Sequence, residues 1–273
     1  MLSPKVFSVF AVLAIVTVSA VNNRNPQTNC NQPSFNANTH GLGTALGLDP
    51  STLWSNPETL QKNLNQLLTK GGLNELTSGC NAFNNFYAGL GRDNIRFCLG
   101  PLGFIKRGKS PSDAWGFDGV LRQNRFQCGS GYYITQYHQG QMLSCIQNTV
   151  KNNIDKLNNV THSYRSNVEH DQLQACKYVG ILQKTYTQIF AKGACARVDA
   201  QLAGFWACEG QSQYISAQFP HCVYTNRCDF STVTQFSEEY VRVNESGDML
   251  IYIPPTWKKN AQGELFQEPE MWI

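Results

Sequence analysis

Apolar side chains recur at helical spacing in residues 168–228, the stretch around which the rest of the chain is organised. Two apolar stripes advance there in steps of three and four residues, with a last step of one in each, which keeps each stripe on one face of a helix. Lys192-Gly193-Ala194 interrupts the pattern, and glycine suits the residue just past a helix end. The stretch therefore predicts two antiparallel helices joined by a short turn. The stripes are Leu173, Cys176, Val179, Leu182, Tyr186, Ile189 and Phe190, then Cys195, Val198, Leu202, Phe205 and Trp206.

Two cysteines of this helical hairpin are predicted to be bonded to each other. In an antiparallel hairpin, positions equidistant from the turn face each other, and the turn is centred near Gly193. Cys176 then lies opposite a position close to Cys208. A disulfide requires Cα atoms within about 7 Å. We therefore expect a Cys176–Cys208 disulfide, with Cys195 pairing elsewhere.

Upstream, the pattern predicts a polar lead-in and then another helix. Residues 21–50 are rich in Asn, Gly, Pro and Thr, which is typical of an extended segment, tethered here by Cys30. A helix is expected to begin near Asn56, which can cap it, with Pro57 at the first helical position. Its apolar stripe is Leu60, Leu64, Leu67 and Leu68.

Residues 99–112 contain several glycines and prolines and are predicted to be a loop. The loop carries a small basic cluster of Lys106, Arg107 and Lys109. This cluster could meet an anionic polymer or could simply be solvated, and we expect the second.

After Cys228 the period changes from that of a helix to that of a strand. Residues 240–243 and 249–253 are rich in β-branched and aromatic side chains, and 244–248 have the composition of a turn, which predicts a β-hairpin. Residues 256–273 are expected to form an extended tail. The predicted fold is mainly α, with a signal peptide at 1–20, a lead-in at 21–50, a disulfide-linked helical domain at 51–228, and the hairpin and tail at 229–273.

The chain has ten cysteines, an even number, and all follow residue 20. In an oxidising compartment this count implies up to five disulfides. Zinc binding is the competing use of cysteine, but no C-x-x-C pair is present and no histidine stands at ligand spacing from a cysteine pair. We therefore predict disulfides and no metal site. The cysteines are Cys30, Cys80, Cys98, Cys128, Cys145, Cys176, Cys195, Cys208, Cys222 and Cys228.

The cysteine spacing has a period. Cys80, Cys128 and Cys176 are 48 residues apart, and each is followed by another cysteine after 16 to 18 intervening residues. Such a period can mark repeated supersecondary units. The spacing is interpreted either as three degenerate helical repeats, with similar disulfide pairing in each, or as chance.

The N-terminus predicts secretion. Lys5 supplies a positive charge, residues 6–18 form an apolar run too short for a membrane span, and Val18-Ser19-Ala20 offers a cleavage site. The mature chain is therefore expected to be extracellular, with no membrane span.

Composition argues against a nucleic-acid partner, since the formal net charge is only +3 and no basic run occurs. Charged residues make up 15% of the chain, and amides replace them with 25 Asn and 21 Gln. A weakly charged polar surface fits a protein that packs into an assembly. Biased amino-acid usage in the source lineage explains the amides equally well.

Searches for catalytic motifs yield none. A G-x-S-x-G elbow, an H-E-x-x-H pair, a Walker loop and a G-x-G-x-x-G fingerprint are all absent, so we predict no catalytic residue and no cofactor. His170 and Asp171 are adjacent, but neighbours on a helix point about 100° apart and cannot orient each other. Glu209 could be a buried functional carboxylate, but a surface position at a helix end is expected. A pair of glycosidase carboxylates cannot be assigned from sequence.

Two N-glycosylation acceptors are present, Asn159 in Asn159-Val160-Thr161 and Asn244 in Asn244-Glu245-Ser246. Ser246 also precedes a glycine between acidic neighbours, as in glycosaminoglycan attachment sites. The two modifications compete at this position, and we expect an N-glycan or an unmodified residue.

Three short segments resemble nematode-type secreted cysteine-rich proteins, including components of the eggshell vitelline layer and domains of unknown function. The segments are Phe126-Gln127-Cys128-Gly129, Leu143-Ser144-Cys145-Ile146 and Phe205-Trp206-Ala207-Cys208-Glu209. The resemblance implies a structural or interaction role in an extracellular coat and transfers no catalytic residue.

The sequence therefore predicts a non-enzymatic matrix or eggshell-like component that contacts secreted glycoproteins or polysaccharide. Two alternatives stay open: a secreted hydrolase acting on glycans, and an extracellular carrier of a small apolar ligand held between helices.

Overall fold

The structure is a computed structural model, and it describes residues 29–228, 241–243, 249–253, 256–259, 265–269 and 271–272. The segment predicted as a signal peptide, Asn244 and Ser246 lie outside the described residues. From Asn29 to Cys228 the chain is an all-helical domain. Its helices are α1 (Gln32–Leu46), α2 (Pro57–Leu68), α3 (Leu73–Asn94), α4 (Pro101–Lys106), α5 (Pro111–Cys128), α6 (Ser130–Gln136), α7 (Gln141–His170), α8 (Ala175–Phe190), α9 (Ala200–Ser216) and α10 (Pro220–Thr225).

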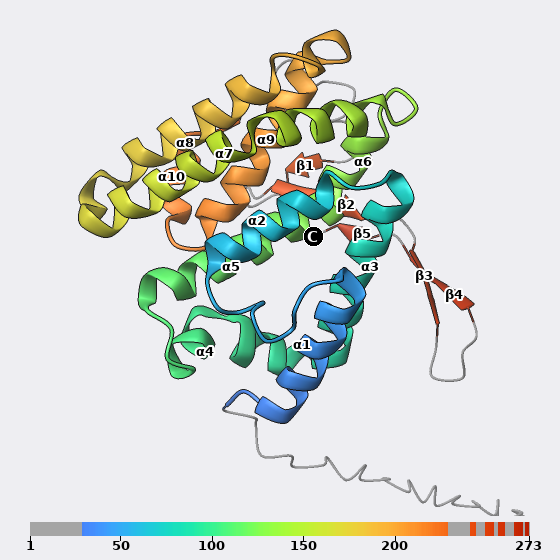
Figure 1. The fold of residues 1–273 in the computed structure, drawn as a ribbon, viewed down its shortest axis with the longest axis vertical. Coiled ribbons are helices and arrows are strands. Elements are labelled where there is room, and N and C mark those ends of the chain that lie inside the picture. Colours follow the sequence, from blue (N-terminus) through green and yellow to red (C-terminus); the bar gives the residue numbers. More distant parts are fainter. Residues whose placement is uncertain are drawn as a thin grey trace, which may run out of the picture.

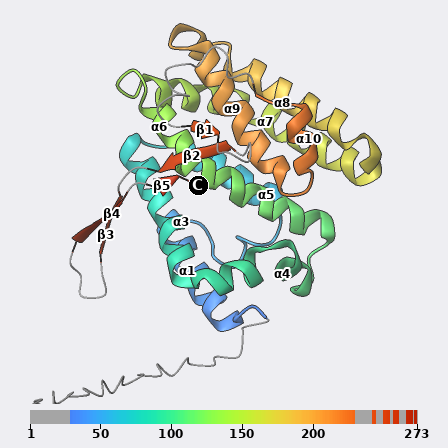
Figure 2. The same ribbon diagram turned by 180° about the vertical axis from the view of Figure 1, so that it is seen from behind.

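The helices form two groups joined by α5 and α2 (Figures 1 and 2). Helices α7, α8, α9 and α10 lie together at one end, with α7 and α8 side by side. Helices α1, α3 and α4 lie at the other end. Helix α5 packs on α9 in the first group and on α4 in the second, and α2 packs on both α5 and α7.

Helix α9 is the centre of the core, and from Leu202 to Ile215 all but one of its residues are buried. A helix that is covered on all sides needs small residues where its neighbours approach closely. A Cβ placed on Gly204 would lie 3.2 Å from Thr187 Cγ2 of α8. The glycine at this position therefore lets α8 and α9 pack tightly.

The predicted start of α2 is confirmed. The side chain of Asn56 accepts hydrogen bonds from the backbone N–H groups of Glu58 (2.8 Å) and Thr59 (3.3 Å), and Pro57 occupies the first turn. The cap satisfies N–H groups that have no partner within the helix.

The prediction of an extended lead-in at 21–50 is wrong for most of its described part, because residues 32–46 form α1. Asn31 caps this helix, and Gly47, with a φ of 65°, ends it. Phe35, Leu42 and Leu46 lie on one face and are buried. The apolar stripe is too sparse to stand out among the polar residues of this segment. The helix is stabilised by its packing on α3, which the amino-acid composition of the segment does not reveal.

The loop predicted at 99–112 also contains a helix, α4. Pro101 stands at its first position, where proline starts a helix rather than breaking it. The basic residues nearby have partners within the protein. Lys106 Nζ donates to Asn29 Oδ1 (2.9 Å), Lys109 Nζ donates to the Ser55 carbonyl (3.0 Å), and the Arg107 guanidinium stacks on aromatic rings.

All ten cysteines are bonded in five disulfides. The predicted Cys176–Cys208 pairing is wrong, although α8 and α9 are neighbours as predicted. A hydrogen bond from Gln183 Nε2 to Ser212 Oγ (2.8 Å) shows that the hairpin is centred near Arg197, beyond Gly193. Cys176 therefore faces a position past the end of α9. The disulfides are Cys30–Cys98, Cys80–Cys128, Cys145–Cys195, Cys176–Cys222 and Cys208–Cys228.

The disulfide pairing does not repeat along the chain. Cys80 and Cys128, which would begin two separate repeats, are bonded to each other. Cys98 pairs instead with Cys30 in front of α1. The spacing of 48 residues is therefore not a repeating disulfide unit.

Among the residues after 228 that the structure describes, five short strands are present. Strand β1 (Val241–Val243) pairs antiparallel with β2 (Met249–Ile253), and Val241 lies opposite Ile251 at the positions where a hairpin was predicted. Strand β5 (Met271–Trp272) pairs with the other edge of β2. Strands β3 (Thr256–Lys259) and β4 (Leu265–Glu268) form a separate ribbon, so the described part of the predicted tail has its own pairing. Among the described helices, none combines the length and the apolar character of a membrane span.

Candidate functional site

The largest of the surface hollows described here lies between α8 and α9 and has a volume of about 560 Å³. We call it the α8–α9 hollow. As far as the described residues go, its lining contains four amide side chains, two cationic side chains and no carboxylate. These side chains are Gln183, Gln188, Gln201 and Asn226, with Lys184 and Arg227.

One wall of the α8–α9 hollow is held by covalent and hydrogen bonds. The disulfide Cys208–Cys228 forms part of the lining. Asn226 Nδ2 donates to the carbonyls of Cys176 (3.2 Å) and Cys222 (3.0 Å), which ties the end of α10 to the start of α8. Gly180 leaves room for this amide, because a Cβ there would lie 2.7 Å from Asn226 Oδ1.

A second, longer depression runs along the pair of helices α7 and α8. It consists of two hollows of about 380 and 290 Å³ that share Lys156 and Thr185, and we call it the α7–α8 furrow. Its α8 side includes Tyr178 and Ile181, and no carboxylate of the described chain lines it. Its α7 side is a polar stripe at helical spacing: Asn148, Asn152, Lys156, Asn159, Ser163 and Asn167.

Both linings are rich in amide side chains. Amide groups donate and accept hydrogen bonds, as sugar hydroxyls do. The α7 stripe was visible in the sequence as polar residues in steps of three and four. A polar stripe by itself does not reveal that a neighbouring helix turns it into a furrow.

Glu209 contradicts its predicted surface position. It lies in the middle of α9 and is 5% exposed. Burial raises the pKa of its carboxyl group, and a hydrogen bond from Gln213 Nε2 (2.7 Å) opposes this effect. Glu209 lines none of the five hollows that we describe. It is a buried structural group, hydrogen-bonded through its side chain to Gln213.

Two other carboxylates meet at one arginine. Arg165 of α7 donates to Glu58 Oε1 of α2 (3.1 Å) and to Asp113 Oδ1 of α5 (2.9 Å). The Arg165 side chain is only 12% exposed. A glycosidase needs one carboxyl group protonated as its acid and a second one free to attack or to activate water. Carboxylates that share an arginine instead form a structural network across three helices.

An apolar cavity lies among α2, α3 and α5, lined by Leu64, Leu67 and Leu76. Two buried polar atoms that have no hydrogen-bond partner among the described residues, Asn124 Oδ1 and Trp206 Nε1, belong to its lining. Its volume is about 50 Å³. This is enough for a few waters but well below the ~300 Å³ at which ligand pockets begin.

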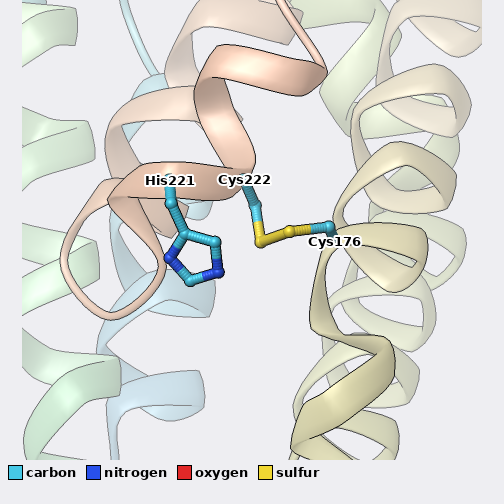
Figure 3. Close-up of side chains that lie close together, drawn as sticks. All are labelled: Cys176, His221 and Cys222. Atoms are coloured by element: carbon cyan, nitrogen blue, oxygen red, sulfur yellow. A yellow bond between two sulfur atoms is a disulfide. The ribbon is translucent and has the colours of Figure 1, made fainter.

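His221 lies beside the Cys176–Cys222 disulfide (Figure 3). One ligand atom from each of these three residues lies within 4.8 Å of the other two, so the group has the spacing of a metal site. The sulfurs are bonded to each other, however, and metals bind the thiolate form of cysteine. This group could not be found from sequence spacing, because Cys176 precedes Cys222 by 46 residues in the chain.

The remaining predicted residues are surface groups or lie outside the described part. Asn159 is exposed on α7 and His170 is exposed at the end of that helix. Asp171 caps the turn that follows by accepting from the Leu173 N–H (3.1 Å), so its carboxylate has a structural role.

Comparison of the chain with known protein families, with curated proteins and with solved structures found no match.

Proposed function

We propose that the protein is a secreted, non-enzymatic structural or interaction component of an extracellular matrix, such as an eggshell-like coat. The observation that carries this proposal is the pairing of all ten cysteines in disulfides, together with an amide-lined hollow to which the described chain contributes no carboxylate. Disulfides persist in oxidising compartments, which fits a protein that works outside the cell.

Durability is the first property that such a component needs. The five disulfides close loops of 20 to 68 residues. Each contributes on the order of 2–4 kcal/mol to the free energy of unfolding. Within each helical group these links also keep the helices together when the chain opens locally, which protects it from proteolysis.

Adhesion is the second property, and the α8–α9 hollow supplies a surface for it. Gln188 and Gln201 are exposed amides on facing helices, and Lys184 and Arg227 add positive charge. Hydroxyl-rich chains, either polysaccharide or the glycans of other secreted proteins, match this surface. Its two cations, with no carboxylate among the described lining residues, favour neutral or acidic sugars.

The first test is where the protein resides and how it is released. A tagged full-length chain is expressed in its own tissue, which is then extracted with salt, with detergent and finally with a reducing agent. We expect the protein to stay in an insoluble extracellular layer through the first two steps. Recovery as a freely soluble protein in body fluid would overturn the matrix proposal.

The second test measures binding by the hollow. Purified protein is sedimented with insoluble neutral and acidic polysaccharides, and a double variant, Gln188→Ala with Gln201→Ala, is compared with it. We expect the double variant to lose most of the bound fraction. Gln174→Ala, an exposed amide outside the hollow, is the matched control and should bind as the unchanged protein does. Equal binding by all three proteins would exclude the hollow as the contact surface.

A further inference from the structure

The acceptor Asn159-Val160-Thr161 lies inside α7, where its two functional side chains point in different directions. Residues two apart on an α-helix are about 200° apart around its axis. Asn159 is exposed and lines the α7–α8 furrow, whereas Thr161 is 3% exposed. An enzyme that must contact both side chains at once cannot do so while the helix is packed.

The Thr161 hydroxyl is also occupied in the folded protein. It donates to the Leu157 carbonyl (3.1 Å) and lies 2.8 Å from the Tyr186 hydroxyl, with which it shares a hydrogen bond. Tyr186 belongs to α8 and is 5% exposed. The residue that makes the acceptor is therefore part of the contact that joins α7 to α8.

We propose that Asn159 receives an N-linked glycan before α7 packs on α8, and that the first sugars of this glycan then lie in the α7–α8 furrow. The transfer forms a bond from Asn159 Nδ2 to the anomeric carbon of a sugar carried on a lipid pyrophosphate. The bond from that carbon to the pyrophosphate oxygen breaks, the lipid pyrophosphate leaves, and the amide loses one proton.

The furrow fits a sugar that is attached to its own lining. Ile181 is 54% exposed and Tyr178 is half-buried, so both can offer apolar surface to the face of a sugar ring. Ser163 and Asn167 lie one and two turns along α7 from Asn159 and offer hydrogen bonds to hydroxyls. A covalently attached ligand is present at a high effective concentration, so weak contacts are enough to keep it in place.

The timing is tested with a cell-free translation system that contains membranes able to glycosylate. An Asn244→Gln background removes the other acceptor. We expect the nascent chain to gain one glycan at Asn159, seen by mass spectrometry, and the same chain to gain none when it is folded before the membranes are added. Modification of the folded chain, or no glycan at Asn159, would contradict the proposal.

The position of the glycan is tested by nitration of tyrosine in the secreted protein. Tyr224 does not line the furrow and is 68% exposed, so it serves as the internal reference. Removing the glycan with an amidase should raise the nitration rate of Tyr178 several-fold and leave that of Tyr224 unchanged.

Two variants complete the nitration test. Asn159→Gln should reproduce the effect of the amidase, because it removes the attachment point. Asn158→Gln changes an amide of the same helix that lines neither hollow of the furrow and leaves the acceptor intact, and it should leave the rate of Tyr178 unchanged. A Tyr178 rate that is the same with and without the sugar would place the glycan in solvent, away from the furrow.

Discussion

Glu209 is 5% exposed in the middle of α9, and a carboxyl group in such a place prefers to be uncharged. Its raised pKa makes stability depend on pH. Above the ordinary value of 4.5 the unfolded chain releases this proton before the folded chain does. The free energy of unfolding therefore falls as the pH rises, until the folded group ionises as well.

We expect Glu209→Gln to raise the melting temperature at neutral pH and to change it little near pH 4. The introduced amide would keep an oxygen that accepts the bond from Gln213, and it would remove the ionisable proton. For a domain of this size, each kcal/mol gained appears as about 2–4 °C. Thermal melts from pH 4 to pH 8 check this, with the exposed Glu169→Gln as control. Parallel pH profiles for the unchanged protein and Glu209→Gln would show that Glu209 does not titrate as argued.

Arg165 is the second residue whose burial sets its role. Its removal leaves Glu58 and Asp113 without their shared partner, so we expect Arg165→Met to cost about 2 kcal/mol in urea unfolding. Arg122 pairs with Asp118 on its own helix and is 45% exposed. Arg122→Met should cost less than about 0.5 kcal/mol. Equal costs would mean that the three-helix network adds nothing beyond a surface pair.

At the scale of elements, the contact of α8 with α10 depends on a missing side chain. Gly180→Ala would place a Cβ 2.7 Å from Asn226 Oδ1 and displace the Asn226 amide, which donates to the carbonyls of Cys176 in α8 and Cys222 in α10. The usual gain from replacing glycine in a helix, up to about 1 kcal/mol, should therefore be lost or reversed.

Gly41→Ala is the matched control, because Gly41 lies inside α1 and an added Cβ there would have no described atom within 4 Å apart from its chain neighbours and the backbone of its own helix. We expect it to raise the free energy of unfolding by up to about 1 kcal/mol. Urea titration of both variants gives the comparison. If Gly180→Ala stabilised the protein as much as Gly41→Ala, the proposed fit of Asn226 against α8 would be wrong.

At the scale of the whole molecule, the disulfides should differ in how much each contributes to the free energy of unfolding. Cys30–Cys98 spans 68 residues and Cys208–Cys228 spans 20. In the chain-entropy account, replacing both cysteines by alanine should cost about 4 kcal/mol for the longer loop and about 3 kcal/mol for the shorter one. Denaturant unfolding of the two double variants measures this difference.

The effect of the two disulfides on polysaccharide binding should have the opposite order to their effect on stability, because Cys208–Cys228 borders the α8–α9 hollow and Cys30–Cys98 does not. We expect removal of Cys208–Cys228 to weaken polysaccharide sedimentation more than removal of Cys30–Cys98 does. The opposite ranking would place the contact surface at the other end of the molecule, near α1.

The sequence by itself determined the properties that depend on near neighbours in the chain. The apolar stripe of α8 from Val179 to Phe190, the capped start of α2 at Asn56 and the even number of cysteines were all readable, because helix periodicity and capping act over a few residues. Leu173, the first residue of the predicted stripe, lies before α8 and is 95% exposed. The same local rules did not predict α1, because its apolar stripe is sparse and the helix is stabilised by packing on α3.

Tertiary structure alone decided which groups meet across long stretches of chain. The pairing of Cys176 with Cys222, the burial of Glu209, and the furrow beside Asn159 all depend on how α7, α8, α9 and α10 pack. A shift of a few residues in the centre of the α8–α9 hairpin was enough to change the predicted disulfide. The physical reason is that contacts between helices depend on the lengths of their connections and on close packing, which no short window of sequence contains.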